Sequence, residues 1–123
     1  MSSATPPKNF THGTILRWRR VPGLVLAEVE YEPGLRVPSH IHANARLVLV
    51  LSGSVTEIRG SDTATFGPST LLLRRADEPH AYAIGERGAT CLVVDVDPAW
   101  LGRAREQAPV LESSAAFRGG LVV

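Results

Sequence analysis

Hydrophobic residues along this chain recur with a period of two, in short segments that glycine and proline separate. The clearest segment, 24–31, places four apolar side chains on one face: Val25, Ala27, Val29 and Tyr31. This alternation is typical of a strand that buries one face. Turn-forming sequences lie on both sides of it, at 21–23 and 32–34. The segment therefore predicts an antiparallel strand between two tight turns.

Further segments of the same kind follow along the chain. The pattern predicts strands at 14–18, 40–51, 55–59, 63–66, 71–73, from His80, and 90–96, with turns at 52–54, 60–62 and 85–88. Residues 47–51 are continuously apolar, which indicates a strand covered on both faces. About eight short strands with turns rich in glycine and proline indicate an all-β sandwich or barrel.

One segment near the end predicts a helix instead. Asp97 and Pro98 provide an N-cap and a first helical residue, and Pro109 ends the run. We therefore expect a loose, flexible arm at 1–11, the barrel at 12–97, and one helix with a tail at 98–123. The tail beyond residue 110 carries only weak signals.

Composition and charge exclude several classes of protein. The chain has 123 residues and a net charge of +1, so it lacks the broad positive field that binds nucleic acids. The run 47–51 is far too short to span a membrane, and the first ten residues contain no signal-peptide core. The lone Cys91 lies in an apolar run and cannot form an internal disulfide. We expect a cytoplasmic protein with no membrane or nucleic-acid partner.

The candidate chemistry is concentrated in three of the four histidines. His40 and His42 are two residues apart, so on a strand both rings would project from one face, roughly 7 Å apart. His80 opens a distant strand that an antiparallel barrel can bring opposite the pair. Three neutral imidazoles can hold a metal ion and leave positions open for water or a substrate.

The spacing of these residues resembles the first motif of the cupin family, Gly-x5-His-x-His-x3-Glu-x6-Gly. Gly34, His40, His42 and Gly53 match it, and the segment from Gly67 to His80 is similar to a stretched second motif. The resemblance covers roughly residues 23–97. It implies a small cupin jelly-roll barrel in which the three histidines point inward at one mouth and bind a divalent transition metal (iron, zinc, nickel or manganese).

The chain departs from this motif at its glutamate, which is replaced by Arg46. A guanidinium stays protonated and cannot bind a metal. Three alternatives follow: a three-histidine metal centre with Arg46 turned aside, an anionic ligand bound by Arg46, or a metal-free pocket for an organic ligand. Tyr82 is two residues from His80, so it shares a strand face with His80 and would line the same pocket.

A narrower resemblance concerns the segments GPSTLLLRRADEPH (67–80) and CLVVDVDPAWL (91–101). Both are similar to the amino-terminal cupin domains of AraC-family transcription regulators, which bind a small effector or form the dimer. The segment 117–120 resembles the start of the linker that follows the cupin domain in those regulators. No DNA-binding region follows in this sequence, so we expect either a stand-alone relative or part of a regulator.

Three functions are compatible with these features. The first is a sensor or ligand-binding domain that takes a small molecule, a metal, or both. The second is a three-histidine, metal-dependent enzyme resembling the non-haem dioxygenases. The third is a structural dimerisation barrel with vestigial histidines. A homodimer is expected in each case, because the run 47–51 needs cover on both faces.

Overall fold

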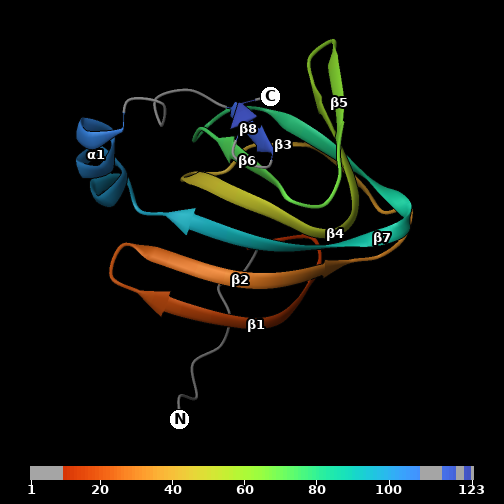
Figure 1. The fold of residues 1–123 in the computed structure, drawn as a ribbon, viewed down its shortest axis with the longest axis horizontal. Coiled ribbons are helices and arrows are strands. Elements are labelled where there is room, and N and C mark those ends of the chain that lie inside the picture. Colours follow the sequence, from red (N-terminus) through yellow and green to blue (C-terminus); the bar gives the residue numbers. More distant parts are fainter. Residues whose placement is uncertain (1–9, 109–114, 119–120, 123) are drawn as a thin grey trace.

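The computed structural model describes residues 10–108, 115–118 and 121–122, and consists almost entirely of strands (Figure 1). The strands are β1 (Thr14–Val21), β2 (Leu24–Tyr31), β3 (Arg36–His40), β4 (Ala45–Arg59), β5 (Asp62–Phe66), β6 (Thr70–Arg74), β7 (His80–Val96), β8 (Ala115–Arg118) and β9 (Leu121–Val122), with one helix, α1 (Pro98–Gln107), after β7. The expected all-β architecture with one late helix is confirmed.

The strands form one antiparallel sheet in the order β1-β2-β7-β4-β6-β8-β9. In addition, β3 pairs with β7 and β5 pairs with β4. The two long central strands, β4 and β7, therefore pair with different strands along their length. The sheet curves round on itself in Figure 1. Among the described residues no pairing joins β9 to β1, so the barrel is open rather than fully closed.

Two turns expected from the sequence are bends inside long strands. The segment 52–54 lies within β4 and 85–88 lies within β7, where the pairing of the two strands shifts in register around Ser52 to Val55. Gly53 has a φ of +77°, and a Cβ there would lie 1.9 Å from the Gly88 carbonyl oxygen. The glycine that suggested a turn therefore serves a β-bulge, which bends the strand without ending it.

The sequence expectation for 40–51 was also wrong at its start. His40 is the last residue of β3, which the pattern did not predict, and β4 begins only at Ala45. His42 therefore lies in the connection between two strands rather than on one strand with His40. The backbone N–H of Asp77 donates to the His42 carbonyl oxygen at 2.9 Å and fixes this connection.

The core lies on the inner face of the curved sheet. Its fully buried members include Val29 on β2, Val50 on β4, Leu72 on β6, and both Cys91 and Val93 on β7. They alternate with outward residues, as the period of two predicts. The apolar half of the interior therefore comes from the four central strands.

The predicted helix is confirmed. The Asp97 carboxylate accepts a hydrogen bond from the Ala99 backbone N–H at 3.0 Å, and Pro98 is the first helical residue. No helix in the described ranges is long and apolar enough to cross a membrane. In the tail, where only weak signals were found, β8 pairs with β6, whereas Pro109 and residues 119–120 lie outside the described residues.

The amino-terminal arm expected at 1–11 is described only from residue 10. Phe10 is 5% exposed and belongs to the core, and the Thr11 hydroxyl lies 2.8 Å from the Tyr31 hydroxyl. The last two residues of the expected arm are therefore packed against the barrel. Residues 1–9 lie outside the described residues.

Candidate metal centre and ligand cavity

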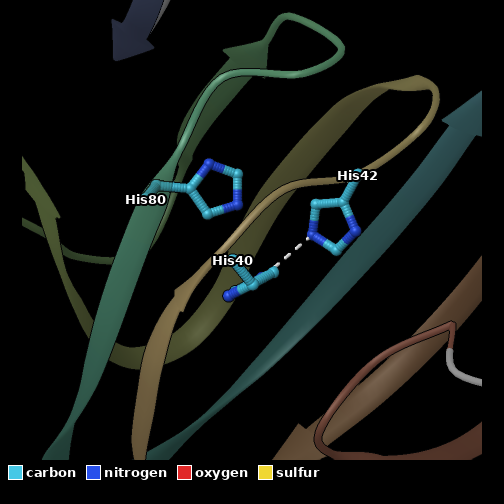
Figure 2. A group of neighbouring side chains, drawn as sticks. All are labelled: His40, His42 and His80. Carbon is cyan, nitrogen blue, oxygen red and sulfur yellow. Dashed lines mark hydrogen bonds between the residues drawn. The ribbon is translucent and has the colours of Figure 1, made fainter.

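The three histidines singled out in the sequence meet at one end of the sheet (Figure 2). His40 ends β3 and His80 opens β7, and the two are directly paired across these strands. His42 reaches the same point from the connection that follows β3. The juxtaposition thus comes from one cross-strand pair and one loop residue, not from two residues on one strand face.

The rings are close enough for their nitrogens to share one ion. Ring centroids are 4.7 Å apart for His40–His42 and for His40–His80, and 5.3 Å apart for His42–His80. One ligand nitrogen from each ring lies within 4.8 Å of the other two. The His40 and His42 Nε2 atoms are 3.1 Å apart, near the separation of about 3.3 Å that two nitrogens take in tetrahedral zinc sites.

Hydrogen bonding determines which ring nitrogens carry protons. His40 Nδ1 lies 2.9 Å from the Pro38 carbonyl oxygen, which can only accept, so Nδ1 is the donor of this hydrogen bond. His40 Nε2 faces His42 Nε2 at 3.1 Å. A carbonyl on Nδ1 is the usual outer partner of a metal-binding histidine, because it directs the Nε2 lone pair at the ion.

The electrostatics keep two of the three rings neutral, those of His42 and His80. Burial, followed by the positive charges of Arg46 and His40, lowers the pKa of His42 to about 3. Burial, followed by the charges of His40 and Arg74, lowers the pKa of His80 to about 4. Both rings are therefore neutral near pH 7, and the neutral imidazole is the form that binds metals.

His80 provides the test of whether these residues fit a metal. It is 2% exposed, and neither of its ring nitrogens has a hydrogen-bond partner among the described residues. Leaving such a group without a partner costs about 1–3 kcal/mol. A cation bound between His40, His42 and His80 would supply the missing partner, so the residues fit a divalent transition metal.

A cavity lies beside the cluster and offers about 40 Å³ to the centres of water-sized molecules. Its apolar wall consists of Val37, Val48, Val55, Leu72, Ile84 and Val93. Its polar wall includes His40, His42, Arg46 and Tyr82. One water needs about 10–15 Å³ by this measure, so the cavity accommodates a ligand of only a few heavy atoms.

Arg46 lines this cavity without entering the histidine cluster. Its Nε donates to the Asp95 carboxylate at 3.3 Å, and its guanidinium lies 4.5 Å from the centre of the Phe10 ring. Asp95 also accepts a hydrogen bond from the Asn44 side chain at 3.0 Å. The terminal nitrogens of Arg46 have no hydrogen-bond partner among the described residues, which leaves its planar fork available to an anion.

Tyr82 also lines the cavity, with its ring centroid 4.9 Å from that of His80 and 5.9 Å from that of His40. Burial, followed by the charge of Glu57, raises the pKa of Tyr82, so its hydroxyl stays protonated. Burial also raises the pKa of Cys91 to about 11, which agrees with its expected role as a small apolar residue.

Sequence reasoning missed two features of this interior. The first is a buried ion pair between Glu57 and Arg74, which are each 3% exposed and make two hydrogen bonds. Glu57 lies two residues after Val55, on the same inward face of the strand, and this position could have indicated the ion pair. The second is His12, whose ring lies 5.2 Å from that of His40 and lines the cavity. No spacing signal links His12 to the other three histidines.

The curved antiparallel sheet and the inward histidines define this protein as a cupin. A family model confirms the narrower resemblance, because the AraC-like ligand binding domain matches residues 22–122. The chain therefore belongs to the AraC-like ligand-binding domain family. No curated protein sequence matches it significantly.

Solved structures support the fold. A cupin superfamily protein from Desulfitobacterium hafniense has a TM-score of 0.59 at 17% identity, over 76% of this chain and 84% of that one. A conserved Streptococcus pyogenes protein of unknown function has a TM-score of 0.57 at 21% identity, over 72% and 78%. Oxalate decarboxylase from Bacillus subtilis, which has Mn(II) centres, has a TM-score of 0.53 at 25% identity over 61% of this chain. The match spans only 21% of the decarboxylase chain.

Proposed function

We propose that this domain binds a divalent transition metal through His40, His42 and His80, and a small carboxylate that reaches both the metal and Arg46. The observation that carries the proposal is His80, whose two ring nitrogens are buried without a partner beside the rings of His40 and His42. Imidazole ligands suit zinc, iron, nickel and copper, and manganese is the metal named for the decarboxylase neighbour.

The carboxylate follows from charge and size. A dication held by three neutral imidazoles keeps its full positive charge, and the free fork of Arg46 adds a second positive group beside the cavity. The cavity is small and largely apolar, so it admits a ligand of only a few heavy atoms. Oxalate and acetate are therefore suitable probes, and the family match favours binding without turnover, as in a sensor.

Metal content provides the first test. The wild-type protein, dialysed against each metal and then against buffer, is analysed for bound metal beside a His40→Ala/His42→Ala double variant. Ile41→Ala is the matched control, because that side chain lies between the two ligands and is 56% exposed. We expect about one metal per chain in the wild type and the control, and none in the double variant. Absence of metal from the wild type would refute the metal half of the proposal.

Calorimetric titration with oxalate and acetate tests the other half. Arg46→Met keeps much of the side chain's apolar length and removes the fork. A charge-assisted hydrogen bond contributes about 1.5–3 kcal/mol, so we expect roughly 10- to 150-fold weaker binding with metal content unchanged. Equal affinity in Arg46→Met would contradict the role of Arg46, and consumption of oxygen or probe would favour the enzyme alternative.

We also propose an isologous homodimer. The outer face of the sheet carries a group of half-buried aliphatic side chains at paired positions on neighbouring strands. They are Leu26, Leu47, Leu49, Leu71, Leu92 and Val94. An apolar face of this kind on a small domain is covered most simply by its copy on a second chain.

A further inference from the structure

The segment that precedes β1 is attached to the barrel at three of its four residues from 10 to 13. Phe10 is buried against the Arg46 guanidinium, and Thr11 is hydrogen-bonded to Tyr31 at 2.8 Å. Gly13 approaches β2 so closely that a Cβ would lie 2.6 Å from a methyl carbon of Val29. The backbone on both sides of His12 is therefore anchored.

These anchors hold the fourth histidine of the chain beside His40, a member of the cluster. The His12 ring centroid is 5.2 Å from that of His40, the two planes are tilted by 57°, and the ring lines the cavity. His12 is exposed, so its ring is not locked by packing. Its ligand nitrogen is outside the group of three that already lie within 4.8 Å of one another.

A metal held by three imidazoles has at least one open position. No carboxylate from the described residues joins the cluster, and Arg46 is held aside by Asp95 and Phe10. Among the described residues that line the cavity, His12 is the fourth imidazole, and it can supply a donor for the remaining position. It adds no charge, and the same Arg46–Phe10 contact that removes the arginine from the cluster brings His12 toward it.

From this arrangement we infer that His12 is a fourth protein ligand of the metal, supplied by the segment 10–13. The inference rests on the proposed metal site. Because the backbone is already anchored, only the exposed His12 side chain would need to rotate to place its imidazole on the ion. A carboxylate ligand then competes with His12 or enlarges the coordination shell.

Cobalt(II) titration tests the inference, because its visible absorption is intense for four-coordinate sites and weak for hydrated sites of higher coordination. We compare the wild type, His12→Ala, Phe10→Ala and, as a matched control, Leu16→Ala, whose side chain on β1 is 49% exposed. Losing even an outer partner of a metal ligand typically costs 10- to 100-fold in affinity. We therefore expect His12→Ala to bind cobalt at least about tenfold more weakly, with reduced absorption.

Two further measurements separate a ligand from a packing residue. Free imidazole added to His12→Ala should restore the cobalt absorption, which a structural defect would not allow. Phe10→Ala, which releases the segment, should weaken cobalt binding, and adding His12→Ala should cause little further loss. The control Leu16→Ala should match the wild type.

The outcomes distinguish this inference from the proposed function. If the wild type and His12→Ala bind cobalt with equal affinity and the same spectrum, His12 is not a ligand and the three-histidine site still stands. If the wild type binds no cobalt at all, both the proposed metal site and the role of His12 are wrong.

Discussion

The buried ion pair between Glu57 and Arg74 gives the most demanding prediction for this barrel. Glu57 points inward from β4 and Arg74 from β6, and their side chains are 3% and 4% exposed. A second arginine, Arg59, lies 3.5 Å from the same carboxylate. Glu57→Gln keeps the shape of the side chain and removes its charge, so the buried guanidinium of Arg74 loses the negative charge of this carboxylate.

The expected cost follows from burial. Removing one partner of a buried pair typically costs about 3–5 kcal/mol, because the remaining charge stays desolvated. For a domain of 123 residues the entropy of unfolding is about 0.26 kcal/mol/K, so each kcal/mol lowers Tm by about 4 °C. We expect Glu57→Gln to unfold roughly 12–20 °C below the wild type.

Thermal and urea unfolding, followed by circular dichroism, measure this cost. Glu28→Gln is the matched control, because it breaks another cross-strand ion pair whose arginine, Arg17, is 81% exposed. Such pairs contribute less than about 1 kcal/mol, so its Tm should fall by less than about 4 °C. Glu57→Leu combined with Arg74→Met should recover most of the lost stability. Equal losses in Glu57→Gln and Glu28→Gln would refute the reasoning.

Three further predictions follow from burial and surface. The pKa of His80 is about 4 in the folded protein against 6.5 for a free histidine, so only the unfolded state takes up its proton as pH falls below 6.5. His80 should therefore lower the free energy of unfolding of the metal-free protein by about 2 kcal/mol between pH 7 and pH 5, as measured by urea unfolding. His80→Gln should lack this part of the pH dependence. Cys91 is 1% exposed and its pKa is raised to about 11, so native protein should not react with a disulfide reagent at pH 8 within the time that unfolded protein reacts fully. Leu49→Glu on the outer face should convert the proposed dimer to a monomer in sedimentation analysis, whereas Leu16→Glu should not.

Most of the fold was predictable because alternation reports which face of a strand is buried. Segment 24–31 is β2 without change, and Asp97 and Pro98 begin the helix as expected. Apart from the missed strand β3, the errors fell at glycines. Sequence alone does not distinguish a glycine that ends a strand from one that bends it, and Gly53 bends β4 because it approaches the backbone of β7.

The site was predictable from the local pair His40 and His42, and from the position of His80 at the start of a distant strand. His40, His42 and His80 meet, although His42 does so from a loop. His12 has no fixed spacing to them, because its position depends on the pairing of β1 with β2 and on the contact between Phe10 and Arg46. Contacts set by long-range pairing leave no periodic signal in the sequence.

The arrangement of charge inside the barrel explains how an arginine can replace a metal ligand. Arg46 and Arg74 occupy directly paired positions on β4 and β6, where like charges destabilise a sheet. Asp95 holds one guanidinium toward β7, and Glu57 holds the other toward the far part of β4, so each positive charge meets a carboxylate.

Both arginines are paired with a carboxylate in this way, and the rings of His42 and His80 beside them are neutral. A dication bound there keeps its charge of two, whereas a glutamate ligand at position 46 would have cancelled half of it. The substitution at position 46 therefore does more than remove a ligand. In the proposed site it would leave the metal electron-poor and place a guanidinium fork beside it, and both changes would favour an anionic ligand.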